Sequence, residues 1–211
     1  MIPGWTDIEN PQVIEEGGDT MRESGEADFR FEAISRYQLT EAEREEFLSL
    51  TKECAFNWCT KDEWPMGVVM TCLWREGRMW LTSAAHRARV TAVRRNPKVS
   101  LVINGAGSPS GQGRNVTIKG ICRIHEDRAT RDWFYPAFAE HAFGAGHLLA
   151  RRLAADLDSE NRVILEVVPE MFLSYDESKN QDHRAGRIDE SRLAPLSDAD
   201  RRLLERAGST L

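Results

Sequence analysis

The chain has 211 residues, of which 41% are hydrophobic and 29% are charged, a composition that fits a globular domain and excludes a wholly disordered protein. Its net charge of −6 argues against a dedicated nucleic-acid-binding protein. No apolar run approaches the length of about 18 residues that a membrane span needs, and the first residues lack a secretory signal pattern. We therefore expect a cytoplasmic protein without a membrane partner.

The charge is unevenly distributed along the chain. Residues 1–35 hold nine acidic and two basic residues, whereas residues 36–175 carry a net charge of +2 and residues 176–211 a net charge of −1. This contrast predicts an acidic N-terminal arm (1–35), one folded domain (36–178) and a C-terminal tail with a short helix (179–211). Because the arm has few apolar residues, we expect it to fold only against another surface.

The four cysteines are scattered and form no CxxC pair (Cys54, Cys59, Cys72 and Cys122). A structural zinc site needs clustered ligands, which this spacing does not provide. We therefore expect buried or half-buried reduced thiols and no metal site.

Secondary-structure signals begin with a helix and continue mainly with strands. Thr40 to Glu43 match a capping box, which predicts a helix that reaches Cys54. Strands are expected over 55–60, 66–74, 79–82, 99–104, 115–125, 163–168 and 171–175, and helices over 84–95, 127–143, 146–157 and from about 198 onward. Gly120, inside an alternating strand, suggests a bulge or a bend of the barrel. Strands in hairpin and meander order predict an antiparallel barrel with helices packed outside it.

The clearest candidate site lies where a strand leads into a basic helix. Thr82 and Ser83 end the strand, and Arg87 and Arg89 follow in the first turns of the helix. A helix N-terminus offers free N–H groups, and hydroxyls and guanidinium groups add hydrogen bonds to an anion. The pattern is compatible with a phosphate site, and also with a capped helix that has a solvated basic face.

Several segments, in this order, resemble the FMN-binding split-barrel family, the pyridoxamine 5′-phosphate oxidase-like proteins. The similar segments are 65–71 (PMGVVMT), 80–83 (WLTS), 87–101, 114–120 (RNVTIKG) and 163–175. Together they cover roughly residues 36–178.

The resemblance implies a mainly β fold with helices, a six-stranded antiparallel split β-barrel that forms a homodimer with flavin at the interface. It also implies which residues bind the cofactor. The flavin ring would run along Val68, Val69, Met70 and Thr71, the phosphate would be held by Thr82, Ser83, Arg87 and Arg89, and Arg114 and Asn115 would face the ring or the ribityl chain. His86 and Arg87 also fit the cation positions, so the register there stays open.

The chain departs from the pattern of true pyridoxamine phosphate oxidases. Neutral residues near Met66 and Thr71 stand where those enzymes carry an Arg and a Lys, and their C-terminal substrate motif is absent. The resemblance therefore does not extend to a vitamin B6 substrate. We expect an FMN-dependent oxidoreductase that acts on a small organic substrate by hydride transfer. The alternatives are an F420-dependent reductase and a non-catalytic flavin- or haem-binding protein.

Overall fold

The computed structural model describes residues 33–106 and 111–206. Nearly all of the predicted acidic arm (1–35) therefore lies outside the described residues. The strands are β1 (Glu53–Cys59), β2 (Pro65–Thr71), β3 (Leu73–Arg75), β4 (Arg78–Ala84), β5 (Lys98–Asn104), β6 (Arg114–His125) and β7 (Arg162–Asp176). The helices are α1 (Glu41–Leu50), α2 (Ala88–Arg95), α3 (Arg128–Phe143), α4 (Leu148–Leu157), α5 (Glu177–Arg184) and α6 (Asp198–Arg206), with a 3₁₀ turn at Glu190–Arg192.

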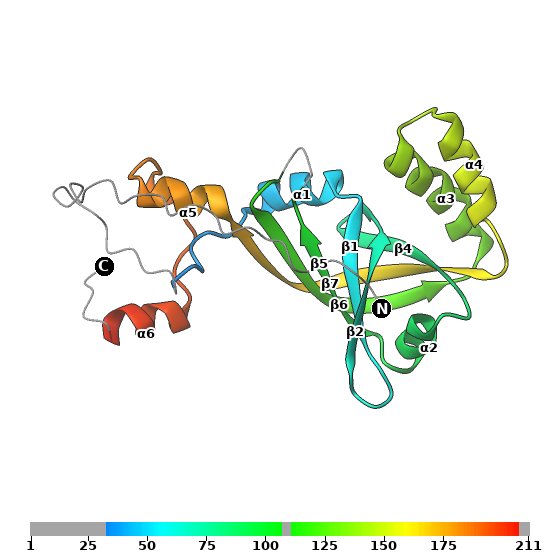
Figure 1. Cartoon of the computed structure of the whole chain (residues 1–211), viewed down its shortest axis with the longest axis horizontal. Helices are drawn as coiled ribbons and strands as arrows, with labels where there is room; N and C mark the ends of the chain where they lie inside the picture. Colours follow the sequence, from blue (N-terminus) through cyan, green and yellow to red (C-terminus); the bar gives the residue numbers. More distant parts are fainter. Residues whose placement is uncertain (1–32, 107–110, 207–211) are drawn as a thin grey trace, which may run out of the picture.

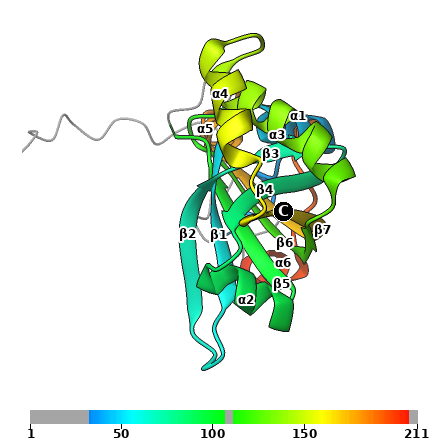
Figure 2. The same cartoon turned by 90° about the vertical axis from the view of Figure 1, so that its right-hand side faces the viewer.

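The seven strands form one antiparallel sheet in the order β2-β1-β5-β6-β7-β4-β3. The sheet curls until β2, at one edge, contacts β4, next to the other edge (Figure 2). This confirms the antiparallel split barrel with helices outside it. The resemblance implied six strands, and the sheet has seven.

The extra strand arises at Cys72. The segment 66–74 was expected to be one strand, but it divides there into β2 and β3. The Cys72 amide donates to the Lys52 carbonyl at 2.9 Å, just beyond the β1–β2 ladder. The chain then turns from its pairing with β1 to a pairing of β3 with β4.

The closing strands 163–168 and 171–175 are in fact one strand, β7, which bends at a bulge. Lys119 pairs with Met171 and Gly120 with Pro169, so one residue of β7, Glu170, has no partner on β6. A Cβ on Gly120 would lie 2.5 Å from the Val168 carbonyl oxygen. The predicted bulge is confirmed, and the close approach of the two backbones explains why it requires glycine.

Helix α1 begins as predicted but ends earlier. The Thr40 side chain accepts from the Glu43 amide, and the Glu43 carboxylate accepts from the Thr40 amide, which completes the capping box. The helix stops at Leu50, so the expectation that it reaches Cys54 is wrong. Cys54 lies on β1, whose alternate side chains enter the core, and this strand periodicity prevails over the helical spacing.

Two other helices begin later than the sequence-based expectation, and one helix was not expected. The basic helix begins at Ala88 rather than Ala84, because Ala84 still pairs with Arg162 on β7. Helix α4 begins at Leu148, and α5 was not predicted at all. Helix α6 is confirmed, and Ser197 caps it by accepting a hydrogen bond from the Asp200 amide at 3.1 Å.

Two groups of buried side chains stabilise the fold. The larger one fills the barrel, and α1 closes one end of it with Phe47 and Leu48. The smaller one packs α3 against the outer side of β4 and β7, where Phe134 meets Trp80 and Ile164. Figure 1 shows the α3–α4 hairpin to one side of the barrel and α5 and α6 extending on the other.

All four cysteines are free thiols, as expected. Three of them are buried and Cys59 is half-buried. Burial raises the pKa of the Cys122 thiol to about 12, which keeps it protonated at neutral pH. In the described ranges, none of the helices combines the length and apolarity that a bilayer-crossing segment needs.

Segments from both ends of the described chain meet beside the barrel. The Ala194 amide donates to the Arg36 carbonyl at 2.9 Å, and the Ser35 amide donates to Asp200 Oδ2 at the same distance. The division of the chain at residues 35/36 and 178/179 stays a prediction.

Candidate functional site

The junction between β4 and α2 presents free backbone donors. Ala85 to Arg87 turn the chain, and Arg87 stands at the N-cap of α2 without a side-chain cap. The first intrahelical bonds return from Val90 and Thr91 to the Arg87 carbonyl. The Arg87 amide donates to the Ala84 carbonyl at 3.1 Å, so within the described residues the amides of Ala88 and Arg89 are the free donors of the first helical turn, where a partial positive charge favours an anion.

The structure brings Ser83 and Arg89 together at this junction. The Arg89 Nε donates to the Ser83 Oγ at 2.9 Å, and Ser83 itself is only 1% exposed. The Ser83 hydroxyl donates in turn to the Ala84 carbonyl oxygen at 3.3 Å. The half-buried Arg89 side chain is therefore held at the end of β4.

The Thr82 hydroxyl is oriented differently. It donates to the Val163 carbonyl oxygen at 3.0 Å and accepts from the Arg162 Nε at 3.3 Å. Because successive side chains alternate along a strand, Thr82 and Ser83 lie on opposite sides of β4. Thr82 therefore accepts a hydrogen bond from Arg162 of β7, and Ser83 accepts one from Arg89 of α2.

Positive charge accumulates around this strand end. Within residues 33–106 and 111–206, Arg87, Arg89 and Arg162 have no acidic side chain as an ion-pair partner. Burial, and then the nearby charges of Arg87 and Arg162, lower the pKa of Arg89. An anion placed here would relieve the mutual repulsion of the guanidinium groups.

The expected flavin strand, β2, forms one edge of the barrel and faces β4 across its split. Val68 and Met70 pack against the barrel core, whereas Val69 and Thr71 are exposed on the outer face. These four residues and the β4–α2 junction thus belong to facing strands.

The other two expected positions, Arg114 and Asn115, lie at the start of β6. Arg114 Nε donates to Asp176 Oδ2 at 2.9 Å, and Asp176 is only 1% exposed. The guanidinium of Arg114 is thus engaged at the end of β7. Asn115 is exposed on the outer face of the sheet, opposite Asn104 and Tyr175 on the neighbouring strands.

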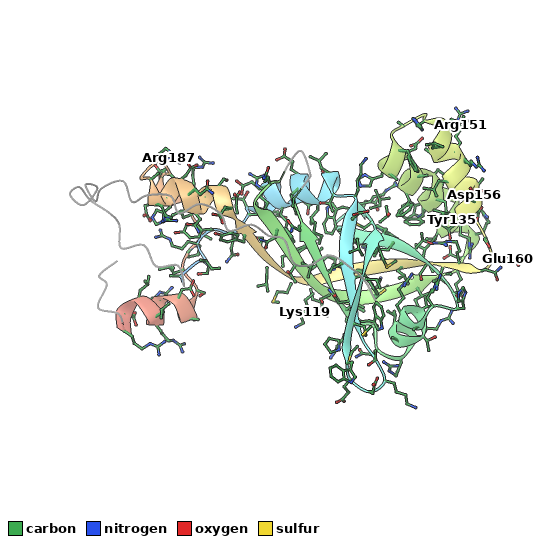
Figure 3. All side chains as sticks on the ribbon, in the orientation of Figure 1. Lys119, Tyr135, Arg151, Asp156, Glu160 and Arg187 are labelled. Atoms are coloured by element: carbon green, nitrogen blue, oxygen red, sulfur yellow. The ribbon has the colours of Figure 1, made fainter. Side chains whose placement is uncertain are left out.

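A row of side chains, four of them apolar and one a threonine, crosses the outer face of the sheet. Opposed pairs connect Val69, Ala55, Val102, Thr117 and Leu173, one residue from each of five neighbouring strands. Val69 is 69% exposed, Val102 42% and Leu173 58%. We call these five residues the outer row. Figure 3 shows Lys119, on the same face of β6, pointing away from the barrel on the side opposite α1.

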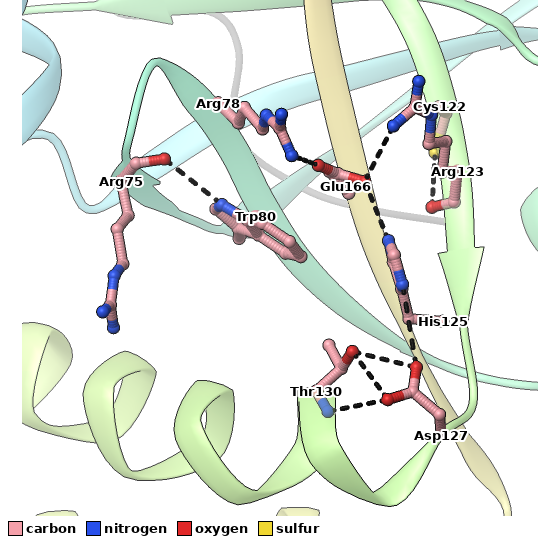
Figure 4. A network of polar contacts seen from close by, with 9 residues as sticks. All are labelled: Arg75, Arg78, Trp80, Cys122, Arg123, His125, Asp127, Thr130 and Glu166. Carbon is pink, nitrogen blue, oxygen red and sulfur yellow. Dashed lines mark hydrogen bonds and ion pairs between the residues drawn. The ribbon is translucent and has the colours of Figure 1, made fainter.

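A separate polar network centres on Glu166 of β7 (Figure 4). Its carboxylate pairs with Arg78 on β4, lies 2.8 Å from His125 Nε2 and lies 3.9 Å from an Arg123 nitrogen. His125 Nδ1 lies 3.8 Å from Asp127, which caps α3. The network therefore connects three strands to the first turn of α3.

Comparison with known proteins places this geometry in a family. The family model of pyridoxamine 5′-phosphate oxidase matches residues 40–174, well over half of the chain. The chain belongs to the pyridoxamine 5′-phosphate oxidase family. The match includes β2, the β4–α2 junction and nearly all of β7. No curated protein matches the chain.

Solved structures in this fold share little sequence with the chain. The conserved hypothetical protein Rv2991 from Mycobacterium tuberculosis superimposes with a TM-score of 0.60 and 18% identity, covering 78% of this chain and 97% of its own. An F420 reductase gives 0.47 and 20%, covering 61% and 94%. A FAD-binding protein from Mesorhizobium loti gives 0.48 and 18%, covering 65% and 93%.

Arg162 was not among the site residues predicted from the sequence. It stands at the first position of β7, where an arginine has no diagnostic neighbour. Only the antiparallel pairing of Arg162 with Ala84 brings it to the end of β4. No local pattern could have indicated this placement.

Proposed function

We propose that this protein binds FMN at the β4–α2 junction and acts as an oxidoreductase on a small organic substrate. The observation that carries the proposal is the hydrogen bond from Arg89 to the buried Ser83, beside two further arginines without acidic partners in the described chain. A terminal phosphate is the group that such a set of donors fits.

The residues present suit the phosphate end of the cofactor. Ser83 holds the Arg89 guanidinium in place, Arg87 adds charge at the N-terminus of α2, and the first amides of that helix add a partial positive charge. Bound flavin would supply hydride-transfer chemistry. Because that chemistry belongs to the cofactor, the chain needs no acid–base pair of its own to qualify as an oxidoreductase.

The remainder of the cofactor would lie along the split of the barrel. Val68 to Thr71 form the β2 edge that faces β4, and Val69 and Thr71 are open to an approaching ring. Asn115, exposed on β6, is the amide that would reach the ring or the ribityl chain. Arg114 would act indirectly, by holding the start of β6 to Asp176.

A second copy of the chain would complete this site. The outer row, flanked by the exposed Met171, gives the sheet an apolar strip across five strands. A stable dimer buries about 800 Å² per partner, which a face of five strands can supply. We propose a homodimer through this face, with the flavin between the copies. A cytoplasmic location stays a prediction.

Titration of the full-length protein with FMN, followed by flavin fluorescence, tests the proposal. Replacing Arg89 with Met should weaken FMN binding at least about tenfold, the effect of one lost charge-assisted hydrogen bond. Arg151→Met, on the exposed surface of α4, is the control and should leave the affinity unchanged (Figure 3).

Two results would overturn the proposal. One is wild-type protein that binds no FMN. The other is an Arg89→Met variant that binds FMN as tightly as the control. Mass spectrometry of the cofactor released from native protein distinguishes FMN from F420 and haem.

A further inference from the structure

Arg162 is held firmly at the entrance to β7. The buried side chain of Arg131, on α3, donates from Nη2 to the Arg162 carbonyl at 2.6 Å and from Nη1 to the Ser159 carbonyl at 2.7 Å. The Arg162 amide donates to the same Ser159 carbonyl at 3.0 Å. Its Nε then donates to Thr82, which directs the guanidinium along the end of β4.

The arginines nearby contrast with Arg162. Arg128 and Arg131 each lie within ion-pair distance of Asp158, and Arg94 pairs with Glu126. Arg162, like Arg87 and Arg89, has no acidic partner in the part of the chain that the structure describes. The stretch that supplies β4 and α2 adds no negative charge, because residues 77–125 contain no Asp or Glu.

The three guanidinium groups of Arg87, Arg89 and Arg162 together carry more positive charge than one phosphodiester can neutralise. A phosphate monoester carries about −1.5 to −2 at neutral pH, because its second pKa is about 6. A diester carries a single charge at its phosphate. The arginines at this strand end are therefore matched to a dianion rather than to a monoanion.

We propose that Arg162 is a third cation of the cofactor site and makes the site select a terminal, dianionic phosphate monoester over a phosphodiester. This rests on the proposed function and goes further, because it chooses between flavin cofactors by the charge of their phosphate. Ser83 positions Arg89 on one side of β4, and Thr82 positions Arg162 on the other. The phosphate would lie beyond Ala84, where the strand ends between the two side chains.

Three ligands separate the contribution of the charge from that of the ring. They are FMN, riboflavin 4′,5′-cyclic phosphate, which is a phosphodiester, and riboflavin, which has no phosphate. Arg162→Gln in the full-length protein should weaken FMN binding about tenfold or more, weaken the cyclic phosphate less, and leave riboflavin unchanged. Arg162→Lys should retain most of the FMN affinity. Arg151→Gln is the surface control.

The pH dependence of the wild-type protein gives a test that needs no variant. As the pH falls from 7 to 5, the FMN phosphate takes up its second proton at a pKa of about 6 and loses charge. FMN binding should therefore weaken over this range, whereas binding of the cyclic phosphate should not. If the affinity for FMN changes with pH in the same way as the affinity for the cyclic phosphate, the proposal is overturned.

The results also separate this inference from the proposed function. If Arg89→Met weakens FMN binding but Arg162→Gln does not, or if Arg162→Gln weakens riboflavin equally, Arg162 is not part of the site while FMN binding stands. If no flavin binds, the increase in unfolding temperature that inorganic phosphate causes tests whether Arg162 belongs to an anion site. A smaller shift for Arg162→Gln than for Arg151→Gln supports the anion site, and equal shifts overturn it.

Discussion

Glu166 Oε2 lies 2.8 Å from His125 Nε2, and the Glu166 side chain is almost completely buried although it lies on the outer side of the sheet. Its polar partners are Arg78, Arg123 and His125 (Figure 4). The centre of β7 thus depends on one carboxylate that compensates a cluster of basic groups.

Removal of that carboxylate should destabilise the fold. Glu166→Ala leaves Arg78 and Arg123 close together without their carboxylate and leaves His125 with only Asp127 nearby, and we expect the free energy of unfolding to fall by about 2–4 kcal/mol. This lies toward the lower part of the range for buried ion pairs, because Arg78 and Arg123 are partly exposed. Urea denaturation measures the change. Glu170→Ala, at the exposed bulge position of the same strand, is the control, and equal losses would contradict the assignment.

The ion pair between Lys179 and Glu43 should make stability depend on pH. Burial acts to raise the pKa of Glu43, but hydrogen bonds from Lys179 and Thr40 outweigh it and lower the pKa below its usual value of 4.5. A lowered carboxyl pKa contributes stability above the unfolded pKa, and that stability disappears as the pH falls through the folded pKa.

Glu43→Gln should therefore be less stable than wild type at pH 7, and the difference should shrink below about pH 4. Thermal unfolding at a series of pH values measures this. Glu46→Gln, exposed on the same helix, should show no such trend. A Glu43→Gln difference that stays constant from pH 7 to pH 3 would show that the pair contributes nothing through its charge.

The bulge should tolerate no side chain at Gly120. An added methyl group would lie 2.5 Å from the Val168 carbonyl oxygen, so either β6 or β7 must move. We expect Gly120→Ala to cost about 1–3 kcal/mol in unfolding free energy. Lys119→Ala, the exposed neighbour, is the comparison, and chemical denaturation of both variants decides. A stability loss at Gly120 no greater than at Lys119 contradicts the expectation.

The outer row should control self-association. Leu173→Glu places a charge at the β7 end of the apolar strip, and we expect the proposed homodimer to dissociate at micromolar concentrations because a buried unpaired charge is costly. Light scattering coupled to gel filtration measures the mass. Leu148→Glu, on α4 and 76% exposed, should stay dimeric. If Leu148→Glu dissociates instead, the interface involves the α3–α4 hairpin.

Features that depend on neighbours in the sequence were predictable. The capping box of Thr40 and Glu43 operates over one helical turn, and Gly120, which lies opposite the β7 bulge, stands out in the alternating strand β6. The proximity of Ser83 and Arg89 belongs to the same class, because six positions connect a strand end to the next helix. Local geometry determines the capping box and the Ser83–Arg89 contact, whereas the glycine only marks the place of a bulge that forms against the distant strand β7.

Features that depend on distant pairing were not predictable. The break at Cys72 reflects a change of partner from β1 to β4, and the continuity of β7 through Pro169 follows from its pairing with β6 along its whole length. Helix α5 is polar and has no clear hydrophobic periodicity. It is stabilised by contacts with distant residues, because its own Lys179 donates to the Glu43 carboxylate and to the Gln38 carbonyl.

By itself, the sequence determined the barrel class, the family resemblance and the basic strand–helix junction, because hydrophobic alternation, caps and turn residues act over a few positions. Only the tertiary structure showed which charged side chains lie together at that junction. Arg162 is 80 positions from Thr82 and meets it only because β7 closes the sheet against β4. Long-range strand pairing leaves no local mark in the chain, so the third arginine could be found only in the folded protein.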